Sequence, residues 1–74
     1  MKVFVTGVGG QLGHDVANEL HKRGHIAFVS DIASEYSGIQ DGSAVTVLPY
    51  VAMDITNADM VQRVLAEVKP DAVI

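Results

Sequence analysis

Four short apolar runs, rich in β-branched residues, are spaced along the chain. Runs of this kind, when bounded by glycine, proline, serine or aspartate, are typical of buried strands. We therefore expect strands at residues 2–6, 26–30, 50–53 and 71–74. Pro49 stands just before the third run, where a proline is tolerated at the start of a strand.

Apolar residues recur at helical spacing between the first two strands. Leu12, Val16 and Leu20 fall on one side of a helix, and polar residues fill most of the other positions. This pattern predicts an amphipathic helix over residues 11–23, with Gly24 in a position suited to end it.

A second apolar stripe predicts a helix that ends before Lys69-Pro70. Thr56 is expected to cap this helix, and Asp59 three residues later resembles the partner residue of a capping box. The members of the stripe, which we interpret as core, are Met60, Val61, Val64, Leu65 and Val68.

Strands and helices alternate in the order β-α-β-loop-β-α-β, and residues 34–44 form a polar loop with two glycines. Such alternation predicts an α/β fold with a parallel sheet and right-handed crossovers. The expected architecture over residues 1–74 is the N-terminal half of a Rossmann-type domain, with strand order 3-2-1-4.

Length and composition limit what the chain can do. Its 74 residues make at most one small domain, which excludes a two-domain enzyme within this sequence. The absence of cysteine excludes disulfides and thiolate zinc sites. A net charge of −4 disfavours nucleic acid as a partner. No apolar run approaches the ~20 residues that cross a membrane, and no signal peptide is recognisable, so we expect a cytoplasmic protein.

The sequence ends in a strand pattern that nothing caps or turns. We therefore expect it to be the N-terminal piece of a longer protein, with the substrate domain absent from this chain. Half of a Rossmann domain leaves a sheet edge open and part of each sheet face uncovered. Self-association of the isolated chain is expected for that reason.

The segment with chemical content is a glycine-rich turn with the spacing Gly7-x-x-Gly10-x-x-Gly13, between the first strand and the first helix. Gly7 allows a tight turn, Gly10 lets a diphosphate approach the backbone, and Gly13 lets the helix pack closely on the sheet. The helix then begins at Gln11 and Leu12, where unpaired N–H groups can meet phosphates. The loop thus predicts a dinucleotide site.

Asp31 ends the second strand, eighteen positions after Gly13. This is close to the ~20 positions expected for the acid that binds the adenosine ribose. A carboxylate there repels the 2′-phosphate of NADP, and the residues that follow, Ile32 to Ser34, include no base. We therefore expect NAD(H), with NADP(H) tolerated if the loop moves, and we place Ile32 in the same site. The alternative is an ordinary glycine-rich turn with an incidental aspartate.

Asp54 and Ile55 follow the third strand. Next to the cofactor site, the carboxylate of Asp54 and a backbone N–H could meet the amino edge of adenine. An equally good interpretation makes Asp54 a plain turn acid ahead of a helix cap. Both interpretations stay open at this point.

Other chemistries find little support in the residues. The chain has no Gly-Lys-Ser or Gly-Lys-Thr of a P-loop and no Gly-x-Ser-x-Gly elbow. His14 and His21 are too far apart for one metal ion, so we interpret His14, His21 and His25 as solvated helix-surface residues. Tyr36 is interpreted as a loop residue and Tyr50 as strand packing, because neither is followed by a lysine four positions later.

The segment Thr6-Gly7-Val8-Gly9-Gly10-Gln11-Leu12-Gly13 resembles the opening of extended short-chain dehydrogenases/reductases. With Asp54-Ile55-Thr56-Asn57 and Lys69-Pro70-Asp71, the chain looks most like the N-terminal part of dTDP-4-dehydrorhamnose reductases. Two features depart from that pattern, namely Val8-Gly9 within the glycine loop and a longer loop from Ile32 to Thr46.

The resemblance implies a reductase that passes hydride from NADPH or NADH to a 4-keto sugar nucleotide. It implies that the glycine loop holds the diphosphate and that Asp31 holds the ribose. It also implies that Asp54-Ile55 lies near the adenine. The catalytic hydroxyl residue and the Tyr-x-x-x-Lys pair would lie beyond Ile74, so no residue here is assigned to catalysis. Three alternatives remain: a sugar-nucleotide epimerase or dehydratase, a non-catalytic dinucleotide-binding regulatory subunit, or a truncated chain without function.

Overall fold

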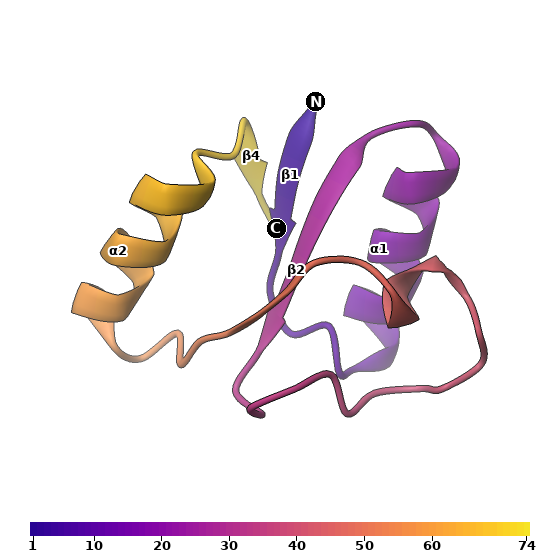
Figure 1. The fold of residues 1–74 in the computed structure, drawn as a ribbon, viewed down its shortest axis with the longest axis horizontal. Coiled ribbons are helices and arrows are strands. Elements are labelled where there is room, and N and C mark those ends of the chain that lie inside the picture. Colours follow the sequence, from indigo (N-terminus) through magenta and orange to yellow (C-terminus); the bar gives the residue numbers. More distant parts are fainter.

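The computed structural model describes all 74 residues of the chain. The strands and helices follow the expected order along the sequence (Figure 1). They are β1 (Lys2–Val5), α1 (Gln11–Lys22), β2 (Ile26–Asp31), a 3₁₀ turn η1 (Ala44–Thr46), β3 (Tyr50–Ala52), α2 (Ala58–Val68) and β4 (Ala72–Val73).

The four strands form one parallel sheet in the order β3-β2-β1-β4, which confirms the predicted fold class and strand order. β1 lies inside the sheet, with Val3 opposite Ala27 of β2 on one side and opposite Ala72 of β4 on the other. Strands with neighbours on both sides and helices beside them bury nearly all their residues, which is why β1 reads as an unbroken apolar run.

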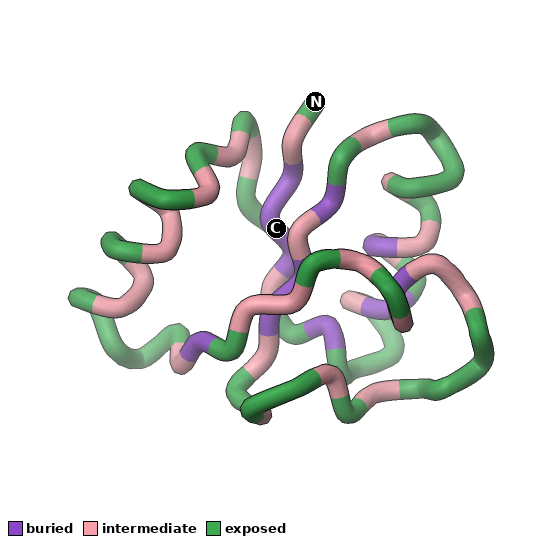
Figure 2. The backbone as a smooth tube through the Cα atoms, viewed as in Figure 1, coloured by how far each residue is buried: buried purple, intermediate pink, exposed green.

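α1 packs against β1 and β2 and forms the core with them. Figure 2 shows that the buried residues gather along the central strands and the facing side of α1. The core cluster consists of Val3, Val5, Val8, Ala17, Val29 and Val45. Gly24 follows α1 with a positive φ of 83°, as its expected role at the helix end requires.

α2 lies across the sheet from α1 (Figure 1) and has no buried residue. Its apolar stripe, including Val64 and Leu65, is half-buried. The interpretation of this stripe as core is therefore wrong for residues 1–74, because no other element of the chain packs closely on it.

The start of α2 differs from the prediction that Thr56 caps it. Asn57 is the N-cap, and its side-chain oxygen accepts the backbone N–H of Met60 at 3.1 Å. Thr56 is engaged elsewhere, since its hydroxyl donates to Asp54 Oδ1 at 2.6 Å. The helix ends as predicted, with Lys69 in the left-handed region and Pro70 after it.

The segment from Ala33 to Val47 runs from the end of β2 back to α1, and we call it the α1 loop. It is a loop as predicted, but η1 at its end places Val45 in the core. Tyr50 of β3 holds its beginning, since the phenol donates to the carbonyl of Ala33 at 2.6 Å. None of the helices combines the length and the apolar character that a membrane crossing requires.

Candidate cofactor site

The glycine turn between β1 and α1 is shaped by two steric requirements. Gly7 has a φ of 66°, in the left-handed region that favours glycine. A Cβ at Gly13 would overlap the carbonyl oxygen of Gly7, so only glycine lets α1 begin this close to β1. These two glycines therefore have the turning and packing geometry that the motif predicts.

The start of α1 offers free donors. The N–H groups of Gln11, Leu12 and Gly13 precede the first helical hydrogen bond, which His14 donates to Gly10, and they have no partner. A Cβ at Gly10 would meet the protein only at 3.6 Å, an ordinary contact. Packing therefore does not require glycine at position 10, but close approach of a ligand to these N–H groups would.

A pocket of about 260 Å³ opens at the carboxyl ends of β1, β2 and β3. Five predicted site residues line it, namely Gly7, Asp31, Ile32, Asp54 and Ile55. Sequence reasoning missed the other four lining residues, which are Thr6, Ser30, Met53 and Thr56. The remaining predicted residues, Gly10, Gln11, Leu12 and Gly13, lie at the α1 terminus and outside this lining. In parallel sheets this edge is where ligands bind.

The carboxylate of Asp31 is held by backbone donors. Oδ2 accepts the N–H of Gly9 at 2.7 Å, and Oδ1 accepts the N–H of Ile32 at 2.8 Å. Both oxygens keep lone pairs free, because a carboxylate can accept about four hydrogen bonds. The acid is thus oriented at the pocket wall while it can still accept from a ligand hydroxyl.

Asp54 serves as a turn acid. Its Oδ1 accepts from the backbone N–H of Thr56 at 2.9 Å and from the Thr56 hydroxyl at 2.6 Å. These hydrogen bonds hold the pKa of Asp54 below its usual value. The geometry supports the turn interpretation, although Asp54 also lines the pocket.

Ser30 is the one buried polar side chain whose oxygen has no hydrogen-bond partner. It lies at the end of β2, is 1% exposed, and belongs to the pocket lining. Buried hydroxyls are usually paired, so an orphan here fits a wall that closes on a ligand or a water. A serine among apolar strand residues is the only sequence signal that could have found it.

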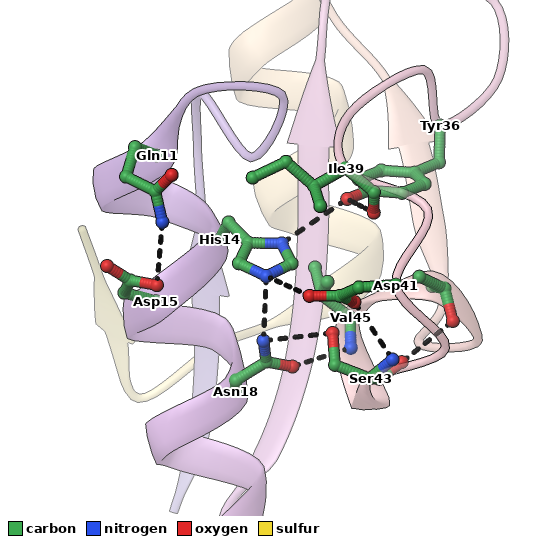
Figure 3. A network of polar contacts seen from close by, with 10 residues as sticks. Gln11, His14, Asp15, Asn18, Tyr36, Ile39, Asp41, Ser43 and Val45 are labelled. Carbon is green, nitrogen blue, oxygen red and sulfur yellow. Dashed lines mark hydrogen bonds and ion pairs between the residues drawn. The ribbon is translucent and has the colours of Figure 1, made fainter.

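The structure corrects the interpretation of His14 as a solvated helix residue. Its side chain is buried and contacts Asp41, Tyr36 and Asn18 (Figure 3). Its loop partners lie 22 and 27 positions away in a segment without a pattern, so local sequence could not reveal them. No group of three metal-ligating acid or histidine side chains gathers anywhere in the chain.

Residues 3–74 match the protein family described as the NAD dependent epimerase/dehydratase family. No curated protein sequence matched the chain.

Several solved structures share the fold. UDP-glucose 4-epimerase from Thermotoga maritima with UDP-glucose is 26% identical, with a TM-score of 0.77 over 99% of this chain and 23% of its own. The Thermus thermophilus UDP-glucose 4-epimerase complex with NAD is 27% identical, with a TM-score of 0.78, and the match covers 99% of this chain and 22% of that one. The Bordetella bronchiseptica enzyme WbmH in complex with NAD⁺ is 28% identical, with a TM-score of 0.70, and the match covers 97% of this chain and 24% of that one.

The chain spans less than a quarter of the length of the first two of these structures, and about a quarter of the third. The similarity supports the broader resemblance, to the extended short-chain dehydrogenase/reductase superfamily. The narrower resemblance to dTDP-4-dehydrorhamnose reductases is not shown by it and stays a prediction.

Proposed function

Because the chain belongs to the NAD-dependent epimerase/dehydratase family, we propose that it is the dinucleotide-binding part of an enzyme acting on nucleotide sugars. One observation carries the proposal. The free N–H groups at the start of α1 and the oriented carboxylate of Asp31 flank the same edge of the sheet. A diphosphate and a ribose diol have the chemistry that these two groups recognise.

In this proposal each part of the site meets one part of the cofactor. The turn with Gly7, Gly10 and Gly13 receives the diphosphate, together with the N–H groups of Gln11 and Leu12. Asp31 accepts from the adenosine ribose hydroxyls, and Ile32 and Ile55 provide exposed apolar surface for the adenine. Asp54 stays hydrogen-bonded to Thr56 and shapes the wall beside that surface.

NAD(H) is the proposed cofactor, rather than NADP(H). The Asp31 carboxylate would face the 2′-phosphate of NADP at the position where it meets a hydroxyl of NAD. No lysine or arginine lines the pocket to offset that repulsion. The NAD complexes of the Thermus and Bordetella structures support the same choice.

NAD supplies hydride transfer, as acceptor from the sugar and then as donor back to it in an epimerase or dehydratase. Residues 1–74 bind and orient this group, and the site described here contains no acid or base placed for the sugar. The epimerase or dehydratase alternative has better support than the reductase, because the family and the solved relatives are of that kind. The reductase remains the second candidate, favoured by Gly10-Gln11-Leu12-Gly13 and Asp54-Ile55-Thr56-Asn57.

This function is tested by cofactor binding and turnover in the whole enzyme to which residues 1–74 are proposed to belong. Calorimetric titration with NAD⁺, NADH and NADPH should give tighter binding for the forms without the 2′-phosphate, and no binding would contradict the proposal. Nucleotide sugars are then supplied with and without added NADH. Turnover without net oxidation of NADH indicates an epimerase or dehydratase, and stoichiometric oxidation indicates the reductase. Cofactor binding without turnover of any nucleotide sugar would instead indicate the regulatory subunit.

A further inference from the structure

His14 joins the first turn of α1 to the α1 loop. It directly follows Gly13 of the glycine turn and is 4% exposed. Its Nε2 lies 3.1 Å from Asp41 Oδ2, and its Nδ1 lies 3.4 Å from the phenol oxygen of Tyr36. Figure 3 shows the imidazole ring between these two loop side chains. A buried histidine in this position needs a role that the cofactor contacts do not supply.

The direction of the neighbouring hydrogen bonds determines what the ring must offer. The Tyr36 hydroxyl donates to the carbonyl of Ile39 at 2.7 Å, so its oxygen is left to accept from His14. Asp41, as a carboxylate, can only accept. Both ring nitrogens therefore face acceptors. A neutral imidazole carries one N–H and would turn a lone pair toward either the carboxylate or the phenol oxygen.

Asn18 makes the opposing contact. Its Oδ1 accepts the N–H of Val45 at 2.8 Å, so its amide nitrogen faces Ser43 Oγ at 3.0 Å and His14 Nε2 at 3.2 Å. That nitrogen would prefer a lone pair on Nε2. It already has Ser43 as an acceptor, however, and a charge-assisted bond to a carboxylate is roughly twice as strong as a neutral one. The Asp41 contact therefore outweighs it, so Nε2 donates its N–H to Asp41. Nδ1 faces the Tyr36 phenol oxygen across 3.4 Å.

We propose that His14 is a positioning residue that fastens the α1 loop to α1 and thereby holds the Asp31–Ile32 wall of the cofactor pocket. The loop begins at Ala33, next to that wall, where the Tyr50 phenol donates to the Ala33 carbonyl. Tyr36 packs edge-on against Tyr50, with ring centroids 6.5 Å apart. His14, Tyr36 and Tyr50 thus form a continuous connection from α1 to the pocket wall. The effect on cofactor binding rests on the function proposed above, whereas the fastening of the loop does not.

Few charges face the ring. Tyr36 and Asp41 of the α1 loop are the titratable groups that contact it, and Asn18 and Ser43 beside them are uncharged. Asp15, the next residue on α1, is turned away and accepts from Gln11 at 3.0 Å (Figure 3). Bonds from Ser43, and secondarily His14, hold the pKa of Asp41 below its usual value.

Asp41 sets an acid limit for this contact. The hydrogen bond from His14 needs Asp41 ionised, so it is lost as pH falls through the lowered pKa of that carboxyl. We expect the α1 loop to stay fastened above that pKa and to loosen in strong acid.

The wild-type whole protein is compared with its His14→Gln variant. The matched control is His21→Gln, which changes an exposed histidine of the same helix. Three readouts are used: the hydrogen bonding of the His14 ring nitrogens by ¹⁵N NMR, amide hydrogen exchange of residues 43–47, and NAD⁺ affinity. His14→Gln should speed exchange in the loop and weaken NAD⁺ binding about fivefold or more. His21→Gln should leave both at their wild-type values.

Asp41→Asn is the second variant, in case His14→Gln does not fold. It removes the charge and keeps an oxygen for the Ser43 N–H, so the contact with His14 should weaken and exchange in residues 43–47 should speed up. A His14 ring that makes no hydrogen bond to Asp41 in the wild type would overturn the proposal. Equal loop exchange in the wild type and His14→Gln would also overturn it. Wild-type protein that fails to bind NAD⁺ but shows the loop response would instead contradict the proposed function alone.

Discussion

The backbone N–H of Gly9 donates to Asp31 Oδ2 across 2.7 Å and so joins the glycine turn to the end of β2. A Cβ on Gly9 would lie only 2.7 Å from that same oxygen. Gly9 does not adopt the left-handed conformation that would itself require glycine. Its lack of a side chain therefore matters for one neighbour, the carboxylate that is proposed to bind the ribose.

Gly9→Ala should displace the carboxylate and leave the fold intact. The new Cβ would clash with the end of the Asp31 side chain and not with backbone. We therefore expect the free energy of unfolding to change by no more than about 0.5 kcal/mol. NAD⁺ binding should weaken by about 1–3 kcal/mol, the usual range for a lost hydrogen bond to a charged group. The preference for NAD⁺ over NADP⁺ should shrink with it. Thermal unfolding and calorimetric titration measure the two effects.

A double-mutant cycle with Asp31→Ala is the control for Gly9→Ala. Asp31→Ala alone should weaken NADH binding by about 1–3 kcal/mol. If Gly9 acts through Asp31, adding Gly9→Ala to that background should change NADH binding little. Additive losses in the double variant would show that Gly9 acts on the cofactor directly.

Gly13→Ala should destabilise the fold, and Gly10→Ala should not. The new Cβ at position 13 would overlap the Gly7 carbonyl, so α1 must move away from β1, and overpacking of this kind costs about 1–3 kcal/mol. At position 10 the Cβ would make only an ordinary contact. Gly10→Ala should instead weaken cofactor binding, because the methyl group would stand where the diphosphate is proposed to approach. Urea unfolding with and without NAD⁺ separates the two glycines, and equal stability of both variants would contradict this division of roles.

These glycines show what sequence alone can predict. The order β3-β2-β1-β4 follows from short apolar runs alternating with helical stripes, because buried parallel strands need covering helices on the way to the next strand. Spacing also predicts Gly7 and Gly13, whose demands are local. Gly9 escaped that reasoning because its partner, Asp31, becomes a neighbour only once β1 and β2 pair.

The wrong predictions of the α2 cap and of the exposure of His14 have similar causes. Thr56 and Asn57 are both good caps, and the choice depends on Thr56 donating to Asp54, which composition does not reveal. His14 stands at a polar position of the α1 pattern, and only the return of the α1 loop buries it. Tertiary contacts between distant segments therefore account for the burial of His14. Local periodicity accounts for the strands and helices that the sequence predicts correctly.

Asp54 should make stability depend on pH in the acid range. Its pKa is lowered in the folded state by the Thr56 hydroxyl and N–H, so the unfolded chain takes up a proton first as pH falls. The stabilisation is present above the unfolded pKa and is lost as pH falls through the lower, folded pKa. Melting temperatures of the wild type and Thr56→Val should therefore differ at neutral pH and converge in strong acid. A difference that grows in acid would contradict this assignment.

Residues 1–74 produced alone should self-associate through α2. Its stripe, with Val64 and Leu65, is only half-buried, so part of its apolar surface stays open to water, and such surface favours association. Sedimentation velocity at micromolar concentration should show dimers or larger species. Leu65→Lys should shift the chain toward monomer, because a charge would be buried in the contact. Gln62→Lys adds the same charge at an exposed position of α2 and serves as the control. A monomeric wild type, or equal dissociation by both substitutions, would contradict association through the stripe.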